Sequence, residues 1–402
     1  MSEPLRFIDL FCGIGGFHQA MMRLPFPTEC VFACDIDKEC REIYNKNYGL
    51  LPASDITQVS EKCLPDFDVL CAGFPCQSFS QAGKKLSMED KRGNLFEHIL
   101  RIAKEKKPKY MFLENVKHIK RISDGKVFEH ILKRIRETGY IVQVEEMSPH
   151  QLGIPQHRER VIFICRREKE GEKEEGEEGA LIKVIPFTLP IISLSPSEQI
   201  EKILIKDPLI KEKYKISKEV EDILNVWDEM VQVFEIGENL SPTILCREFQ
   251  TAQADSTSPI SPAWKQEYIA KNKRIFHKYE SQWLDWLDKN ITLLSKKEIY
   301  SKLEWQSGKK REGDSIWNYF IQLRQSGIRV KKCDYFPALV AIVQTPIYAK
   351  EKRYICPREC ARLQSFPDEF QMHPVDKIAY KQFGNAVNVD VIHFFLSNVL
   401  NC

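Results

Sequence analysis

The first 165 residues alternate short apolar runs with segments in which apolar residues recur at helical spacing. Such runs predict buried strands, and the amphipathic segments between them predict helices. Strands that alternate with helices predict an α/β domain with a parallel sheet. The expected strands are residues 6–10, 30–34, 67–72, 110–113 and 161–165, and the expected helices are residues 13–24, 37–48, 95–106 and 127–138.

The pattern changes after residue 167. Residues 168–180 are rich in Glu and Gly and cannot bury apolar area, so we expect a disordered acidic surface loop there. Mixed helix and loop patterns follow to about residue 335, order returns over residues 337–345, and helices are expected at 357–363 and 389–400. The expected parts are a catalytic domain at 1–167, the acidic loop at 168–180, an inserted domain at 181–340, a hinge with a C-terminal motif at 341–376, and a return to the catalytic domain at 377–402.

Composition narrows the class of protein. Of the 402 residues, 43% are hydrophobic and 29% are charged, as in an ordinary globular protein. No apolar run reaches the roughly 18 to 20 residues that cross a bilayer, and the first residues do not resemble a secretory leader. We therefore expect a cytoplasmic protein without membrane contact. Many of the 13 cysteines lie in apolar runs, and none forms a CxxC pair, which predicts buried free thiols and no metal site.

Charge is unevenly distributed, although the net charge is only +2. Residues 296–332 carry ten Lys or Arg against four acidic residues, with Trp305 and Trp317 among them. A basic, aromatic-rich stretch suits the DNA backbone, but it also fits an ordinary solvated surface. Charge alone leaves both interpretations open.

A glycine-rich turn follows the first expected strand. Gly13-Ile14-Gly15-Gly16 opens a helix, and Asp35 ends the second strand, where an acid can bind a ribose hydroxyl. Together they indicate a nucleoside cofactor, but they do not separate a dinucleotide from S-adenosylmethionine. A tight structural turn would also explain the glycines.

Candidate catalytic residues follow two later strands. Cys76 lies in a loop after residues 67–72, near several cationic residues, where a thiol can act as a nucleophile; an inert thiol in a turn is the alternative. Glu114 closes the strand at 110–113 and can donate a proton, or simply cap the next helix. Arg158 and Arg160 would share one face of a strand, which suits phosphate or carbonyl oxygens or a simple charge pair at a strand edge.

Taken together, these segments closely resemble the DNA (cytosine-5) methyltransferases. Six motifs occur in the family's order, over about residues 5–165 and 337–400. They are Phe7-Ile8-Asp9-Leu10-Phe11-Cys12-Gly13-Ile14-Gly15-Gly16, Gly73-Phe74-Pro75-Cys76-Gln77, Glu114-Asn115-Val116, Gln156-His157-Arg158-Glu159-Arg160, the stretch from Pro357 to Asp368, and Gln382-Phe383-Gly384-Asn385-Ala386-Val387.

The resemblance implies a Rossmann-like methyltransferase sheet with a smaller inserted target-recognition domain. It implies sequence-specific methylation of cytosine carbon 5 in double-stranded DNA, with base flipping and a covalent adduct at Cys76. Glu114 would bind the cytosine ring and Arg160 its carbonyl, while Arg158 would anchor the active-site loop or the DNA backbone.

The cofactor implied is S-adenosyl-L-methionine, and the resemblance carries its contacts over residue by residue. They are Phe11, Gly13, Ile14, Gly16, Asp35, Ile36, Asp55, Ile56, Gly73, Pro75, Leu95, Asn385 and Val387. Two positions depart from the commoner residues of the family: Ala338, where threonine is frequent, and Ser365, where glycine is frequent. The first departure puts one DNA contact in doubt.

DNA contacts are expected from the nucleophile loop and from the basic stretch. They are Gln77, Ser80, Lys84, Lys309, Lys310, Lys331 and Lys332. The resemblance is to the stand-alone prokaryotic or phage modification enzymes, so we expect a monomer in a bacterial, archaeal or phage-infected cell. A cognate restriction endonuclease acting on the same site is a further expected partner.

Three other functions share some of these sequence features. A tRNA cytosine-5 methyltransferase of the same fold typically carries Cys-Phe-Thr near the recognition segment, which this sequence lacks. A catalytically silent DNA-binding relative would not need Cys76, Glu114 and Arg160 together. A dinucleotide oxidoreductase is supported only by the glycine turn and Asp35.

Overall fold

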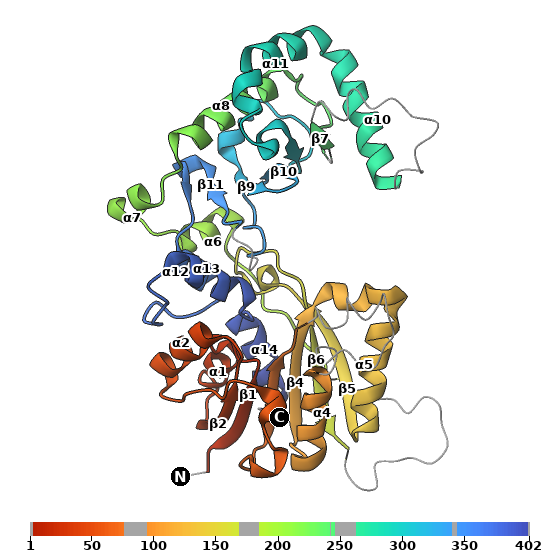
Figure 1. Ribbon diagram of the computed structural model, residues 1–402, viewed down its shortest axis with the longest axis vertical. Helices are drawn as coiled ribbons and strands as arrows, with labels where there is room; N and C mark the ends of the chain where they lie inside the picture. Colours follow the sequence, from red (N-terminus) through yellow and green to blue (C-terminus); the bar gives the residue numbers. More distant parts are fainter. Residues whose placement is uncertain are drawn as a thin grey trace. The chain divides into compact units, whose positions relative to one another are not determined.

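The computed structural model describes residues 3–75, 95–168, 185–241, 243–245, 263–339 and 344–400. The chain forms two compact units (Figure 1). The first unit comprises Met1–Ser193 and Cys360–Cys402, and the second comprises Leu194–Glu359. The expected acidic loop at 168–180 lies, apart from Glu168, outside the described residues.

A six-stranded sheet with the order β2-β1-β3-β4-β6-β5 forms the centre of the first unit. Its strands are β1 (Leu5–Leu10), β2 (Thr28–Cys34), β3 (Val69–Gly73), β4 (Tyr110–Val116), β5 (Tyr140–Met147) and β6 (Arg160–Arg167). Its helices are α1 (Gly16–Met21), α2 (Lys38–Tyr48), α4 (Leu95–Lys106), α5 (Lys126–Glu137), α13 (Asp376–Asn385) and α14 (Val389–Leu400), while α12 (Pro357–Leu363) runs across the boundary between the units.

The sheet is not wholly parallel, which corrects the expectation from sequence. Strands β2, β1, β3 and β4 run parallel, whereas β6 runs antiparallel to both β4 and β5. The link from β5 to β6 contains only a short turn of 3-10 helix, Pro149–Leu152, and no crossover helix, so the two strands pair as antiparallel neighbours. Strand β5 was not expected, because Gln143, Glu145 and Glu146 interrupt its apolar residues.

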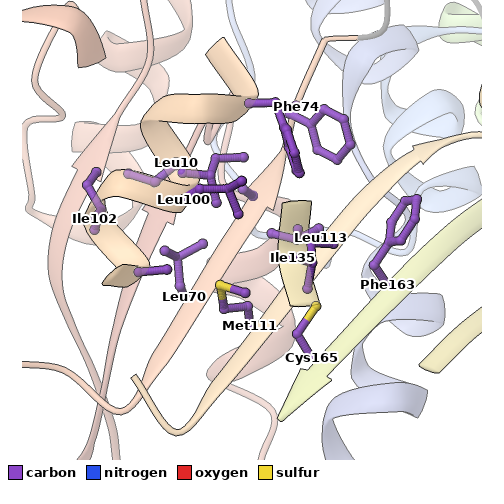
Figure 2. Close-up of a cluster of buried hydrophobic side chains, with 14 of the residues drawn as sticks. Leu10, Leu70, Phe74, Leu100, Ile102, Met111, Leu113, Ile135, Phe163 and Cys165 are labelled. Carbon is purple, nitrogen blue, oxygen red and sulfur yellow. The ribbon is translucent and has the colours of Figure 1, made fainter. Parts of the chain in front are cut away.

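The core of this unit lies between the sheet and the helices α4 and α5. Leu70, Met111 and Cys165, on three neighbouring strands, are fully buried and pack with Leu100 of α4 and Ile135 of α5 (Figure 2). At the other end of the chain, α14 packs against α1. Residues from both ends of the sequence therefore contribute to one unit.

The second unit combines helices with a second six-stranded sheet, of order β12-β11-β9-β10-β8-β7. The helices are α6 (Pro196–Ile203), α7 (Pro208–Lys213), α8 (Lys218–Val233), α10 (Ala263–Lys278) and α11 (Glu280–Leu294). The strands are β7 (Thr243–Leu245), β8 (Leu303–Trp305), β9 (Phe320–Arg324), β10 (Gly327–Lys331), β11 (Ile347–Tyr348) and β12 (Arg353–Tyr354). This sheet was not expected from sequence, because its strands have only two to five residues.

Candidate active site

The parallel strands β1 to β4 bring their carboxyl ends to one edge of the first sheet, where open α/β sheets bind ligands. Phe11 follows β1 and Asp35 follows β2. Gly73 ends β3 and is paired in register with Glu114 of β4. These four expected cofactor and base-binding residues therefore lie at a single edge of the sheet.

Two hydrogen bonds hold the carboxylate of Asp35, and one of them joins the glycine turn after β1 to the end of β2. The N–H of Gly13 donates to Oδ2 of Asp35 at 2.7 Å, and the N–H of Asp37 donates to Oδ1 at 2.8 Å. Gly13 and Gly15 have φ values of 54° and 88°, in the left-handed region that favours glycine. Burial raises the pKa of Asp35, although these two hydrogen bonds oppose the rise. The carboxyl group is thus fixed beside the turn.

A buried aromatic cluster supports the same turn. The hydroxyl of Tyr48 donates to the carbonyl oxygen of Gly15 at 2.9 Å, and a Cβ on Gly15 would overlap the Tyr48 ring. His18 stacks on Tyr48 with ring centroids 3.9 Å apart, and its Nδ1 lies 2.8 Å from the hydroxyl oxygen of Tyr44. Burial lowers the pKa of His18 to about 4, so this imidazole is neutral at neutral pH.

The surroundings of Asp35 fit a nucleoside. Ile36 directly follows it and is 80% exposed, so it presents an apolar surface suited to an adenine ring. The half-buried Asp55 is held by the N–H of Thr57, which donates to its Oδ1 at 2.9 Å. By contrast, Ile14 and Ile56 are buried, so their side chains pack inside the protein.

The C-terminal segment reaches this edge through Val387. A Cβ on Gly16 would lie 2.6 Å from Cγ2 of Val387, and a Cβ on Gly73 would lie 3.6 Å from its Cγ1. Glycine at position 16 therefore permits the close approach of Val387. The neighbouring Asn385 is exposed.

Arg158 fixes this segment to the sheet. Its guanidinium, in a residue only 3% exposed, donates from Nη2 to the carbonyl oxygens of Gly384 at 2.9 Å and Ala386 at 3.0 Å. This burial is incompatible with the expected alternative that Arg158 binds the DNA backbone. Its role in the structure is to hold the segment that carries Val387.

Glu114 and Arg160 form an ion pair at the end of β4. The Nε of Arg160 lies 2.7 Å from Oε1 of Glu114, and both side chains are largely buried. The other carboxylate oxygen faces Gly73, since a Cβ on that glycine would lie 3.8 Å from Oε2. Asn115, the next residue, donates from Nδ2 to the carbonyl oxygen of Phe74 at 2.9 Å, which fixes the chain two residues before Cys76.

The remaining expected site residues divide into three groups. Half-buried Phe11 and Leu95 pack against the core, and Pro75 is half-buried after β3. Cys76, Gln77, Ser80 and Lys84 lie outside the described residues. The other four are lysines of the second unit: Lys309, Lys310, Lys331 and Lys332.

Only one of these lysines is exposed. Lys309 is exposed, whereas Lys331 and Lys332 are half-buried. Lys310 is 4% exposed and donates from Nζ to the carbonyl oxygen of Asp314 at 2.7 Å. The expectation that Lys310 binds a DNA phosphate is therefore corrected, because its charge is directed into the protein.

Three residues that shape the site had no role assigned from sequence: His18, Tyr48 and Asn115. One usable signal was the spacing of Tyr44 and Tyr48, one turn apart on α2, the helix that follows β2. Among the described residues, every cysteine is a free thiol and no group of three His, Cys, Asp or Glu side chains could hold a metal ion. No described helix is long and apolar enough to cross a membrane.

Comparison with known proteins gives concordant results. The family model described as C-5 cytosine-specific DNA methylase matches residues 5–401. The type II methyltransferase M.HhaI of Haemophilus parahaemolyticus is 31% identical over 98% of this chain and 94% of its own length. The type II methyltransferase M.BanI of Aneurinibacillus aneurinilyticus is 29% identical over 96% of this chain and 94% of its own length.

Solved structures share the fold. The Dnmt2 methyltransferase of S. pombe has a TM-score of 0.54 at 21% identity and covers 99% of this chain and 98% of its own. The methyltransferase EhMeth of Entamoeba histolytica has a TM-score of 0.53 at 19% identity, with coverage of 100% and 99%.

Because His18 is neutral in the folded state, acid should destabilise the protein through this residue. Its folded pKa of about 4 lies below the ordinary value of 6.5, so the unfolded chain binds the proton first as the pH falls. His18 should therefore cost about 2 kcal/mol of unfolding free energy between pH 7 and pH 5. Urea unfolding of wild type and His18→Gln at both pH values measures this, and an equal loss in both proteins would contradict it.

We expect Arg158→Lys to loosen the C-terminal segment, because one ammonium group cannot reproduce the planar fork that reaches two carbonyl oxygens. Leaving a buried acceptor unpaired should lower the free energy of unfolding by about 1–3 kcal/mol. Hydrogen exchange should rise at residues 384–387. The control is Arg167→Lys, an exposed arginine that ends β6, and equal effects of the two changes would refute the role of Arg158.

Proposed function

This chain belongs to the C-5 cytosine-specific DNA methylase family, and we propose that it methylates carbon 5 of cytosine at a specific site in double-stranded DNA. The observation that carries the proposal is the Glu114–Arg160 ion pair, which lies beside Gly73 at the end of the strand leading to Cys76. A carboxylate and a guanidinium placed together can bind the ring nitrogen, the amine and the carbonyl of one cytosine.

The chemistry needs a nucleophile, because carbon 5 of cytosine reacts poorly until a group adds to carbon 6. In our proposal the Cys76 thiolate forms a bond with carbon 6 while Glu114 hydrogen-bonds or protonates ring nitrogen 3. Arg160 holds both Glu114 and the cytosine carbonyl oxygen. After methylation, carbon 5 loses its proton to water, and the electron pair of that C–H bond forms the double bond between carbons 5 and 6. The bond between sulfur and carbon 6 breaks at the same time, which regenerates the thiolate.

The target cytosine must leave the duplex to reach Glu114 and Arg160, because both side chains are largely buried. Asn115 would position the loop that carries Cys76, since it holds the carbonyl oxygen of Phe74. Arg158 would act as a positioning residue, through the segment that carries Val387.

S-adenosyl-L-methionine supplies an electrophilic methyl group when it is bound. The fixed carboxyl group of Asp35 would hold its ribose, and the exposed Ile36 would pack on its adenine. The backbone of the glycine turn, Asp55 and Val387 would complete the site; Ile14 and Ile56 would contribute through their backbone. The remaining proposed contacts are Phe11, Gly73, Pro75, Leu95 and Asn385.

Sequence choice would lie in the second unit, because the cofactor turn and the Glu114–Arg160 pair belong to the first. Exposed Lys309 and the half-buried Lys331 and Lys332 remain proposed contacts to DNA. From the loop after β3, Gln77, Ser80 and Lys84 remain proposed DNA contacts as well. Since the relatives are named type II methyltransferases, we also propose a partner endonuclease for the same site.

The alternatives fit less well. A function as a tRNA methyltransferase is less well supported, because Cys-Phe-Thr does not occur in the sequence and the relatives given above are named type II methyltransferases. A silent DNA-binding relative would have no use for a buried Glu114–Arg160 pair beside the nucleophile loop.

The covalent step is tested with Cys76→Ser, which should abolish methyl transfer while binding of labelled S-adenosylmethionine stays near normal. A duplex containing 5-fluorocytosine should trap an adduct at Cys76, because fluorine cannot leave carbon 5 as a proton does. Mass spectrometry locates the adduct, and Cys63→Ser, which changes an exposed thiol, is the control. An adduct elsewhere, or an active Cys76→Ser protein, would show that the nucleophile is wrongly assigned.

For Glu114→Gln we expect turnover to fall by roughly 100- to 10,000-fold, because glutamine can hydrogen-bond but cannot supply a proton. DNA affinity should change little. Single-turnover methylation and duplex binding measure the two quantities. The control is Glu137→Gln, since Glu137 is the last residue of α5 and pairs with Arg134 of the same helix. A rate within a few-fold of wild type would remove Glu114 from the proposed role.

A further inference from the structure

A cleft of about 930 Å³ lies within the second unit, outside the chemistry described above. One wall is a face of α10, and the other is the turn at residues 235–239 together with Lys309. The residues that line it are Glu235, Ile236, Gly237, Glu238, Asn239 and Lys309 on one side, and Glu267, Ala270, Lys271, Arg274 and Lys278 on the other.

The α10 residues of the cleft share one helical face. Their spacing of three or four residues places them in a single stripe. Lys271, Arg274 and Lys278 supply three cations, and Ala270 leaves space between them. Lys273 of the same helix does not line the cleft.

A buried carboxylate orients two of these cations. The Glu238 side chain is only 4% exposed, and its Oε1 accepts from Nη2 of Arg274 at 2.7 Å. Its Oε2 accepts from Nζ of Lys278 at 3.0 Å and from the hydroxyl of Tyr279 at 3.3 Å. Burying a carboxylate is costly unless it is paired, so these bonds hold the cations as firmly as they hold Glu238.

Arg274 is held but not covered. Its side chain remains 53% exposed. Of its five N–H groups, one donates to Glu238, and within the described part of the chain this is its one hydrogen bond. A guanidinium fixed on one side by a carboxylate presents its other N–H groups in a defined direction. Such an arginine can bind two acceptors of one partner at once.

The charges of the cleft favour base edges over phosphates. Four cations face it, but Glu235, Glu238 and Glu267 nearly balance them. A phosphate track needs a cationic excess, whereas base edges present both acceptors and amine donors. The paired acceptors O6 and N7 of guanine are the commonest target of a fixed arginine in the major groove.

We propose that Arg274, oriented by buried Glu238, reads a guanine of the target site in the major groove of the DNA. The proposal rests on the proposed function, because it assumes that duplex DNA is the substrate. It makes Arg274 a specificity-determining residue and assigns no chemical step to this cleft.

The test maps methylated cytosines by bisulfite sequencing on a duplex pool with randomised flanks, for wild type, Arg274→Ala, Glu238→Gln and Lys273→Ala. Wild type should require guanine at one position, and Arg274→Ala should lose about 10- to 100-fold of that preference without relaxing other positions. Glu238→Gln should weaken the same position, because Arg274 loses its charged anchor. Lys273→Ala should keep the wild-type site.

Two results would overturn the proposal. Arg274→Ala and Glu238→Gln could both keep the wild-type site, or binding could weaken equally for every duplex with a shallower salt dependence, which is the signature of a phosphate contact. If Arg274→Ala does not fold, Arg274→Lys replaces it, since lysine keeps the charge but not the planar fork. A wild-type protein that methylates no duplex contradicts the proposed function instead.

Discussion

The buried guanidinium of Arg158 connects parts of the chain more than 220 residues apart, and the candidate site depends on that connection. Its two bonds to backbone carbonyls hold the turn after α13 against the residues that precede β6. Val387 can then contact both Gly16 and Gly73, the first in the cofactor turn and the second on the strand toward Cys76. Without the Arg158 hydrogen bonds, Asp35 and Glu114 would still lie at the edge of the sheet. The contacts of Val387, which connect the cofactor turn to β3, would be lost.

Sequence predicted the parts of this edge that obey simple periodicity. The helices at 95–106 and 389–400 occur with the expected bounds, and Asp35 directly follows β2. Glu114 lies within β4, two residues before its end, because that strand extends further than expected. Periodicity could not predict that β6 runs antiparallel, because strand direction depends on the connection and not on the apolar pattern. The hydrogen-bond partners of Arg158 could not be predicted either, since the residues around it in the sequence do not identify the carbonyl oxygens of Gly384 and Ala386.

Support from within the protein also escapes a residue-by-residue search for chemistry. Tyr48 and His18 carry no reactive role, yet the Tyr48 ring fills the space that a side chain at position 15 would need. Glycine is thus required at position 15 for two reasons: the φ of 88° is left-handed, and the Tyr48 ring leaves no space for a Cβ. The hydroxyl of Tyr48 also donates a hydrogen bond to the carbonyl oxygen of Gly15, which an apolar side chain could not do.

The second unit shows why charges counted along a sequence do not tell which side chains are free to bind DNA. Between residues 296 and 332 basic residues are in excess, but several of them are paired with other groups of the protein. Lys297 pairs with Glu219, Arg329 pairs with Glu304, and Lys310 donates to a backbone carbonyl in the interior. Arg274 lies outside that stretch, and its value for recognition comes from Glu238, which is 36 residues distant in sequence. Whether a charged side chain is both exposed and fixed in direction depends on the folded structure and cannot be read from a basic run. An exposed arginine held by a buried carboxylate is therefore a better candidate for a specific contact than a run of lysines.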